Sequence, residues 1–205
     1  MARESRARQV KKAIRAQYAL LAYNLAEAAF SMFFGSAAGS IALLSFGLDS
    51  LVESASTIIV THRLGISGRV SLKEENARER RAFMFVGYSF IALAIYVAFE
   101  SARKLATHEV PEASMPGIII AAASIMVMPA MSRYRHDIGH EIGSNSLVAD
   151  SKQTMLCAYM SVALLLGIGL NLVFGWWWAD PLAGLAIAAL AFMEGKKALE
   201  GKTCC

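Results

Sequence analysis

Cysteine is scarce in this sequence, because the chain of 205 residues contains only three. Cys157 lies inside an apolar run, and the other two are the adjacent residues Cys204 and Cys205. A disulfide-stapled domain needs paired cysteines at several separated positions, so that class of protein is excluded.

A cleavable leader and a separate soluble domain are also missing from the pattern. The basic segment from Arg3 to Arg15 leads into a full-length apolar run, which is typical of a first transmembrane helix and not of a removed leader. Apolar runs and short links fill nearly all of the chain, which leaves no room for a soluble domain of ordinary size. We therefore expect no cytoplasmic C-terminal domain, only a short tail at 201–205 that carries the cysteine pair.

Apolar residues, by contrast, are abundant. They make up 56% of the chain and the mean hydropathy is +0.46, whereas a soluble domain usually has roughly 45–50%. A membrane-spanning helix needs about 20 mostly apolar residues. The sequence thus predicts an all-α membrane protein whose domain, residues 17–200, has six transmembrane helices, near 17–35, 40–62, 82–104, 116–132, 146–170 and 179–198.

Basic residues mark one side of the membrane. They gather in the segment 1–16, between the second and third runs, after the fourth and after the sixth, whereas the opposite side has only Arg103 and Lys104. Because Lys and Arg favour cytoplasmic segments, both termini are predicted to be cytoplasmic. The same arrangement accounts for the net charge of +4, so nucleic acid is not an expected partner.

Two acids lie inside the second predicted span. Asp49 and Glu53 are four residues apart, which places both on one face of a helix near the middle of the bilayer. A central acid costs roughly 2.5–3.5 kcal/mol on insertion scales, so such residues usually face an internal path. Two close carboxylates also repel, and without a cation at least one tends to hold a proton. The pair therefore predicts half of a metal site that exchanges protons for a divalent ion.

The fifth predicted span supplies the other half. Asp150, Gln153 and Cys157 follow one another at spacings of three and four, along one helical stripe. A cysteine thiolate favours zinc and cadmium, whereas magnesium and calcium prefer oxygen ligands. Taken alone, Cys157 is equally well a small buried apolar residue. Opposite a carboxylate pair the ligand interpretation is favoured, with Gln153 as a weak ligand or as a donor to one.

For other polar residues in and near the spans, the sequence indicates structural roles or leaves several roles open. Asn24 and Glu27 share a face of the first span, where Glu27 completes the site, accepts a proton or pairs with another polar group. Glu100 is expected to form an interfacial salt bridge with the neighbouring basic residues. Asp180 is expected to cap the start of the sixth span and not to bind metal.

A polar stretch is predicted to form a cytoplasmic loop before the fifth span. It contains His136, Asp137, His140 and Glu141. The spacing of four between the histidines would suit a metal on a helix, but in a loop these side chains are more simply solvated.

Two motifs resemble those of the cation diffusion facilitators, a family of metal transporters. Residues 40–53 read Ser-Ile-Ala-Leu-Leu-Ser-Phe-Gly-Leu-Asp-Ser-Leu-Val-Glu, and the family pattern is Ser-x-Ala-Leu-Leu followed by His/Asp-Ser-Leu-x-Asp. Residues 147–157 read Leu-Val-Ala-Asp-Ser-Lys-Gln-Thr-Met-Leu-Cys, where the family has Leu-x-Ala-Asp-x-x-His-x-x-x-Asp. Residues 177–182, Trp-Trp-Ala-Asp-Pro-Leu, are similar to the family's start of span six.

The resemblance implies metal ligands at Asp49, Glu53, Gln153 and Cys157. Three of these depart from the family pattern, since Glu, Gln and Cys replace Asp, His and Asp. Asp150 then becomes a candidate for direct coordination. The resemblance also implies a homodimer, here held by the spans.

The expected function is therefore transport and not catalysis. We expect export of Zn²⁺, with Cd²⁺ as a second substrate, from the cytoplasm across a bacterial inner membrane by proton antiport. Two other functions stay open: a proton-coupled exporter of organic cations, and a membrane receptor or scaffold that transports nothing.

Overall fold

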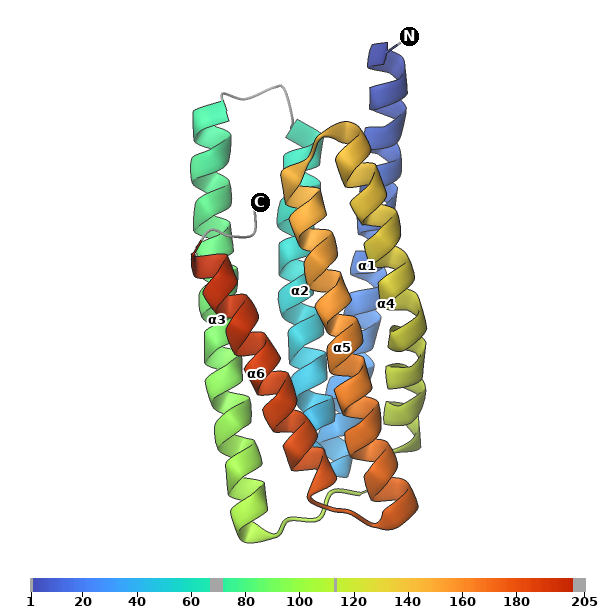
Figure 1. Ribbon diagram of the computed structural model, residues 1–205, viewed down its shortest axis with the longest axis vertical. Coiled ribbons are helices and arrows are strands. Elements are labelled where there is room, and N and C mark those ends of the chain that lie inside the picture. The colour runs from blue at the N-terminus through green and yellow to red at the C-terminus, as the bar shows by residue number, and fades with distance from the viewer. Residues whose placement is uncertain (1, 67–71, 113, 201–205) are drawn as a thin grey trace.

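The computed structural model describes residues 2–66, 72–112 and 114–200. These residues form six helices and no strand: α1 (Ala2–Ala38), α2 (Ile41–Ile66), α3 (Leu72–Thr107), α4 (Met115–Ile142), α5 (Asn145–Phe174) and α6 (Ala179–Leu199). The helices run alternately up and down, so the start of α1 and the end of α6 lie toward the same end of the bundle (Figure 1). Six helices are thus confirmed, whereas a cytoplasmic location of that end stays a prediction. Cys204 and Cys205 lie outside the described residues.

Helix α4 is longer than predicted, and the expectation of a loop before the fifth span is wrong. Residues 136–141 belong to α4, which ends at Ile142. Buried positions continue at helical spacing through Ser132, Arg135, Ile138 and Ile142, so the inner face of the helix extends well beyond the apolar run. The helix stops at Gly143, whose φ of 68° is readily adopted only by glycine.

Asp180 has a capping role, but at a different helix from the one predicted. Helix α6 begins without a side-chain cap, although Asp180 lies in its first turn. The Asp180 carboxylate instead accepts hydrogen bonds from the Ser40 hydroxyl and, at 3.0 Å, from the backbone N–H of Ile41. It therefore caps the N-terminus of α2 and fastens α6 to it.

The bundle buries many polar side chains beside an apolar core, and it exposes many large apolar ones. Many large apolar side chains are exposed, including Phe33 at 67% and Met126 at 73%, whereas Asn24, Asp49 and Glu53 are almost completely buried. Within the described residues three segments are long and apolar enough on their own to cross a bilayer: Ile41–Gly65, Met115–Ile142 and Asn145–Phe174. An apolar outer face, with the polar side chains turned inward, is the pattern expected in a surrounding lipid phase.

Packing brings α2, which carries the two acids, against α5, which carries the thiol. Helix α1 pairs with α2, α4 with α5, and α3 with α6, while α2 lies centrally and also contacts α5. The α3–α6 contact is close, since a Cβ on Gly195 would lie 2.9 Å from the backbone oxygen of Gly87. The α2–α5 contact sets Asp49 and Glu53 against Cys157.

Candidate metal centre

Three side chains from two helices form a buried cluster. The Cys157 thiol of α5 donates to Oδ2 of Asp49 at 3.0 Å and to Oε2 of Glu53 at 2.8 Å, both on α2. Asp49, Glu53 and Cys157 are exposed by 1%, 0% and 2%. The spacing of four on α2 turns both acids toward α5, because residues i and i+4 lie on one helical face. We call Asp49, Glu53 and Cys157 the thiol–carboxylate cluster.

The chemistry of the cluster fits a soft divalent ion better than a hard one. A thiol and two carboxylates together offer sulfur and oxygen donors, a set that suits zinc and cadmium. In the arrangement described here the donor atoms contact one another, and no group of three or more His, Cys, Asp or Glu side chains in the described part of the chain surrounds a space for a metal ion. Metal binding therefore requires the thiol to give up its proton and the three side chains to separate.

A buried ion pair lies next to the cluster. Arg135 of α4, wholly buried, pairs with Asp150 of α5. Its guanidinium also donates to the Thr154 hydroxyl at 2.6 Å, and Thr154 donates to the Glu53 carboxylate. Asp150 accepts two more hydrogen bonds, which come from Gln17 at 3.1 Å and Ser56 at 2.8 Å. Asp150 is a candidate ligand from its sequence position, but in the structure its carboxylate is neutralised by the Arg135 guanidinium.

Glu27 lies on the other side of the cluster, held by hydroxyl groups. Its carboxylate accepts hydrogen bonds from Ser50 of α2, at 2.7 Å, and from Ser124 of α4. The Tyr23 hydroxyl lies 2.9 Å from that of Ser124. Asn24 is fully buried, and neither of its amide atoms has a hydrogen-bond partner among the described residues. Glu27 is therefore placed as a buried acid beside Asp49, separated from it by the Ser50 position.

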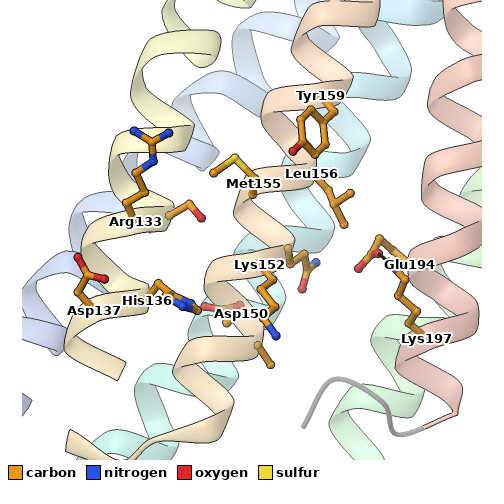
Figure 2. Close-up of a pocket in the computed structure, with 13 residues that line it drawn as sticks. Arg133, His136, Asp137, Asp150, Lys152, Met155, Leu156, Tyr159, Glu194 and Lys197 are labelled. Atoms are coloured by element: carbon orange, nitrogen blue, oxygen red, sulfur yellow. Dashed lines mark hydrogen bonds and ion pairs between the residues drawn. The ribbon is translucent and has the colours of Figure 1, made fainter. Parts of the chain in front are cut away.

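Gln153 does not join the cluster but lines a cavity between α4, α5 and α6. The cavity has a volume of about 580 Å³, and Asp150 also forms part of its wall. Figure 2 shows side chains from all three helices around it: Arg133, His136 and Asp137 from α4, Lys152 and Tyr159 from α5, and Glu194 and Lys197 from α6. The amide nitrogen of Gln153 is buried, and no described residue accepts its hydrogen bond. Asp150 in the cavity wall pairs with Arg135, Arg135 donates to Thr154, and Thr154 donates to Glu53. These hydrogen bonds connect the cavity wall to the cluster.

Comparison with known proteins decides what kind of protein carries this cluster. The sequence model of the cation efflux transmembrane domain matches residues 18–199, nearly the whole chain. The chain belongs to the cation efflux family. Its members are the cation diffusion facilitators, so the resemblance carried by the two motifs is confirmed.

Individual relatives agree with this family. An uncharacterised transporter of Synechocystis is 27% identical over 83% of this chain and 57% of its own length. An uncharacterised transporter of Methanocaldococcus jannaschii is 29% identical over 74% and 54%, respectively. The magnetosome protein MamB of Magnetospira is 24% identical over 84% and 60%. The chain thus spans less than two thirds of the length of each of these relatives.

The family and the fold agree on the class of protein. This cation efflux protein is an integral all-α membrane protein, as the sequence predicted. Members of the family are transporters and not enzymes.

The sequence interpretation missed two of the residues that surround the cluster. Arg135 lies beyond the predicted end of the fourth span at residue 132, and Thr154 lies between Asp150 and Cys157 on the fifth span but is not among the predicted site residues. A signal for Arg135 was present: counting back from Ile142 at helical spacing gives Ile138, Arg135 and Ser132, all buried. A basic residue on an inner helical face needs an acid partner, and Asp150 was the candidate without one.

Proposed function

We propose that this protein exports Zn²⁺, and also Cd²⁺, from the cytoplasm in exchange for protons, with Asp49, Glu53 and Cys157 as the ligands. The contact of one thiol with two buried carboxylates carries the proposal. Arg135 supports the choice of ligands, because it pairs with Asp150, whereas no basic side chain among the described residues forms an ion pair with the cluster.

Proton exchange follows from the chemistry of the same three groups. Thiolate and carboxylates bind metal only when deprotonated, so each ion that binds releases protons, and each ion that leaves allows them to return. Glu27, hydrogen-bonded to Ser50 next to Asp49, is the proposed acceptor of a released proton. Zinc flux should therefore follow an imposed pH gradient, and a flux indifferent to that gradient would contradict antiport.

Reconstitution in liposomes tests the ligands. Asp49→Asn and Glu53→Gln should each abolish Zn²⁺ flux, whereas Glu112→Gln, which removes an exposed acid, should leave it unchanged. Circular dichroism and elution in detergent check that each variant is folded. Normal flux in both cluster variants would refute the ligand set. An organic cation serves as a competing substrate, and its transport by the wild type would favour the rival function.

Cys157 is the proposed determinant of ion preference. Sulfur shifts the preference toward soft ions, so Cys157→Ser should weaken Cd²⁺ binding more than Zn²⁺ binding. Cys157→Asp supplies the carboxylate that the family pattern has here, and it should reduce discrimination against Mn²⁺. Competition binding with the three ions measures both effects, and unchanged preferences in both variants would show that the thiol only packs.

The proposal extends to assembly and location. A homodimer held by the spans, with both termini in the cytoplasm of a bacterium, follows from the family resemblance and from the distribution of basic residues. The mass of the particle in a lipid nanodisc tests the dimer, and labelling of single introduced cysteines from either side of the membrane tests the orientation.

A further inference from the structure

Asn24 of α1 is a buried amide without a hydrogen-bond partner in the described part of the chain. Its side chain is fully buried, and neither Oδ1 nor Nδ2 has a partner among those residues. Burial of an unpaired polar atom costs stability, and the asparagine amide contains both an acceptor and a donor. Alanine has no polar side-chain atom and forms helices more readily, so it would avoid that cost. A bound species therefore explains this amide better than packing does.

The neighbours of Asn24 on α1 locate the amide beside the thiol–carboxylate cluster. Four residues earlier, Leu20 packs in the same buried apolar group as Cys157 of α5. Three residues later, Glu27 accepts a hydrogen bond from Ser50 of α2 at 2.7 Å. Residues three and four apart share one face of a helix. The amide thus lies on the inward face of α1, between a contact with the thiol helix and a contact with the acid helix.

The antiparallel register of α1 and α2 gives the level of the amide on the acid helix. A Cβ on Gly47 would lie 3.0 Å from the Cβ of Ser31, and Ser50 contacts Glu27. One turn back along α1 therefore corresponds to one turn forward along α2. The next turn back from Glu27 reaches the amide, and the next turn forward from Ser50 reaches Glu53. The amide lies at the level of a cluster carboxylate.

The charge of the cluster favours a neutral group as its further ligand. Zinc in proteins usually has four ligands, and the cluster supplies three. A thiolate and two carboxylates already exceed the charge of a divalent ion by one, and a buried excess charge is costly. A carboxylate from Glu27 or Asp150 would increase that excess. Both are also engaged already, Glu27 by Ser50 and Asp150 by Arg135, whereas an amide oxygen adds a ligand without adding charge.

We propose that Oδ1 of Asn24 is the fourth ligand of the ion held by Asp49, Glu53 and Cys157. Its Nδ2 then donates to the second oxygen of the Glu53 carboxylate, so that ion binding satisfies both halves of the amide. A neutral amide oxygen binds a cation more weakly than a carboxylate does, which favours release of the ion during transport. This role rests on the proposed function, because it takes the thiol–carboxylate cluster as the metal site.

Zinc binding to the purified full chain in lipid nanodiscs tests the ligand. Loss of a group that only orients a metal ligand typically costs about 10–100-fold in affinity, so Asn24→Ala should weaken zinc binding at least about tenfold. Its midpoint of thermal unfolding without metal should not fall, because an unpaired buried amide has been removed. Asn24→Asp, which has the same size and restores an oxygen ligand, should recover most of the affinity.

Ser31→Ala is the matched control for this experiment. It removes another fully buried α1 side chain without a partner among the described residues, two turns from the amide, and should leave zinc affinity unchanged. A structural amide predicts the reverse for Asn24→Ala, namely a lower unfolding midpoint with wild-type zinc affinity. That result would overturn the proposal, and so would equal losses of affinity in Asn24→Ala and Asn24→Asp.

Cobalt distinguishes failure of this proposal from failure of the proposed function. Co²⁺ bound by Cys157 should give a sulfur-to-metal charge-transfer band, and its visible d–d bands report the geometry and the other ligands. At saturating Co²⁺, Asn24→Ala should keep the charge-transfer band and shift the d–d bands. Unchanged d–d bands would refute Asn24 as a ligand and leave the cluster standing. A wild-type chain that lacks the charge-transfer band would refute the proposed function, and this proposal with it.

Discussion

The ion pair between Arg135 and Asp150 gives the sharpest test of the bundle interior. Both side chains are buried, and removing one member leaves the other as an uncompensated charge, which costs about 3–5 kcal/mol. The two single variants should differ. After Arg135→Met, Asp150 keeps the hydrogen bonds from Gln17 and Ser56, so the loss should lie near 3 kcal/mol.

Asp150→Asn should cost more, near 5 kcal/mol, because it leaves Arg135 with fewer compensating partners. The Nε atom of Arg135 already lacks an acceptor among the described residues, and the Thr154 hydroxyl is then its main hydrogen-bond acceptor. The double variant Arg135→Met/Asp150→Asn removes both charges. It should be less destabilised than either single variant, and with single losses near 3 and 5 kcal/mol this corresponds to a coupling of at least about 5 kcal/mol.

Unfolding by dodecyl sulfate in mixed micelles, followed by tryptophan fluorescence, measures these free energies. Arg133→Met is the matched control, because Arg133 is exposed two residues earlier on the same helix and should cost less than about 0.5 kcal/mol. Additive effects of the two single variants would refute the reasoning, since additivity would mean that neither charge depends on the other.

Three further predictions concern the frame around the cluster. Asp180→Ala removes the cap of α2 and should lower the free energy of unfolding by about 1–2 kcal/mol in the same assay. An unchanged free energy of unfolding would show that the cap does not stabilise the protein. Gly195→Leu should cost about 1–3 kcal/mol by forcing α3 and α6 apart, whereas Gly169→Leu, at a position with open space, should not, and equal effects would contradict the close approach. Arg103 hydrogen-bonds Glu109 and lowers the pKa of that carboxyl, so their pairing stabilises at neutral pH and is lost as pH falls through the lowered pKa. NMR titration of Glu109 should then give a higher pKa in Arg103→Ala, and an unchanged pKa would count against the pairing.

Local spacing made much of this structure predictable. The positions of the helices follow from apolar runs, and the shared face of Asp49 and Glu53 follows from the helical repeat alone. The spacing from Asp150 to Cys157 likewise placed the thiol on an inward stripe of α5. These features depend on residues within two turns of one another, which is the range over which the sequence pattern is informative.

Contacts between distant helices were the features that the sequence did not reveal. Asp180 looked like the cap of its own helix, because a local cap is the common case, yet its carboxylate reaches the start of α2. Asp150 looked like a free ligand because its partner, Arg135, lay beyond the predicted end of the fourth span. In both cases the partner lies on another helix, so the periodicity of the residue's own helix does not reveal the pairing.

The pairing of α3 with α6 has a consequence for how the protein is made. The chain is synthesised from its N-terminus, and α4 and α5 are made between these two helices. During that interval the close contact of Gly87 with Gly195 cannot form, because α6 has not yet been made. Helix α3 therefore lies in the membrane without α6, the helix it contacts most in the folded protein. Helices α1, α2, α4 and α5 have all their mutual partners before α6 emerges. The thiol–carboxylate cluster, which lies between α2 and α5, can therefore assemble while the nascent chain is still on the ribosome.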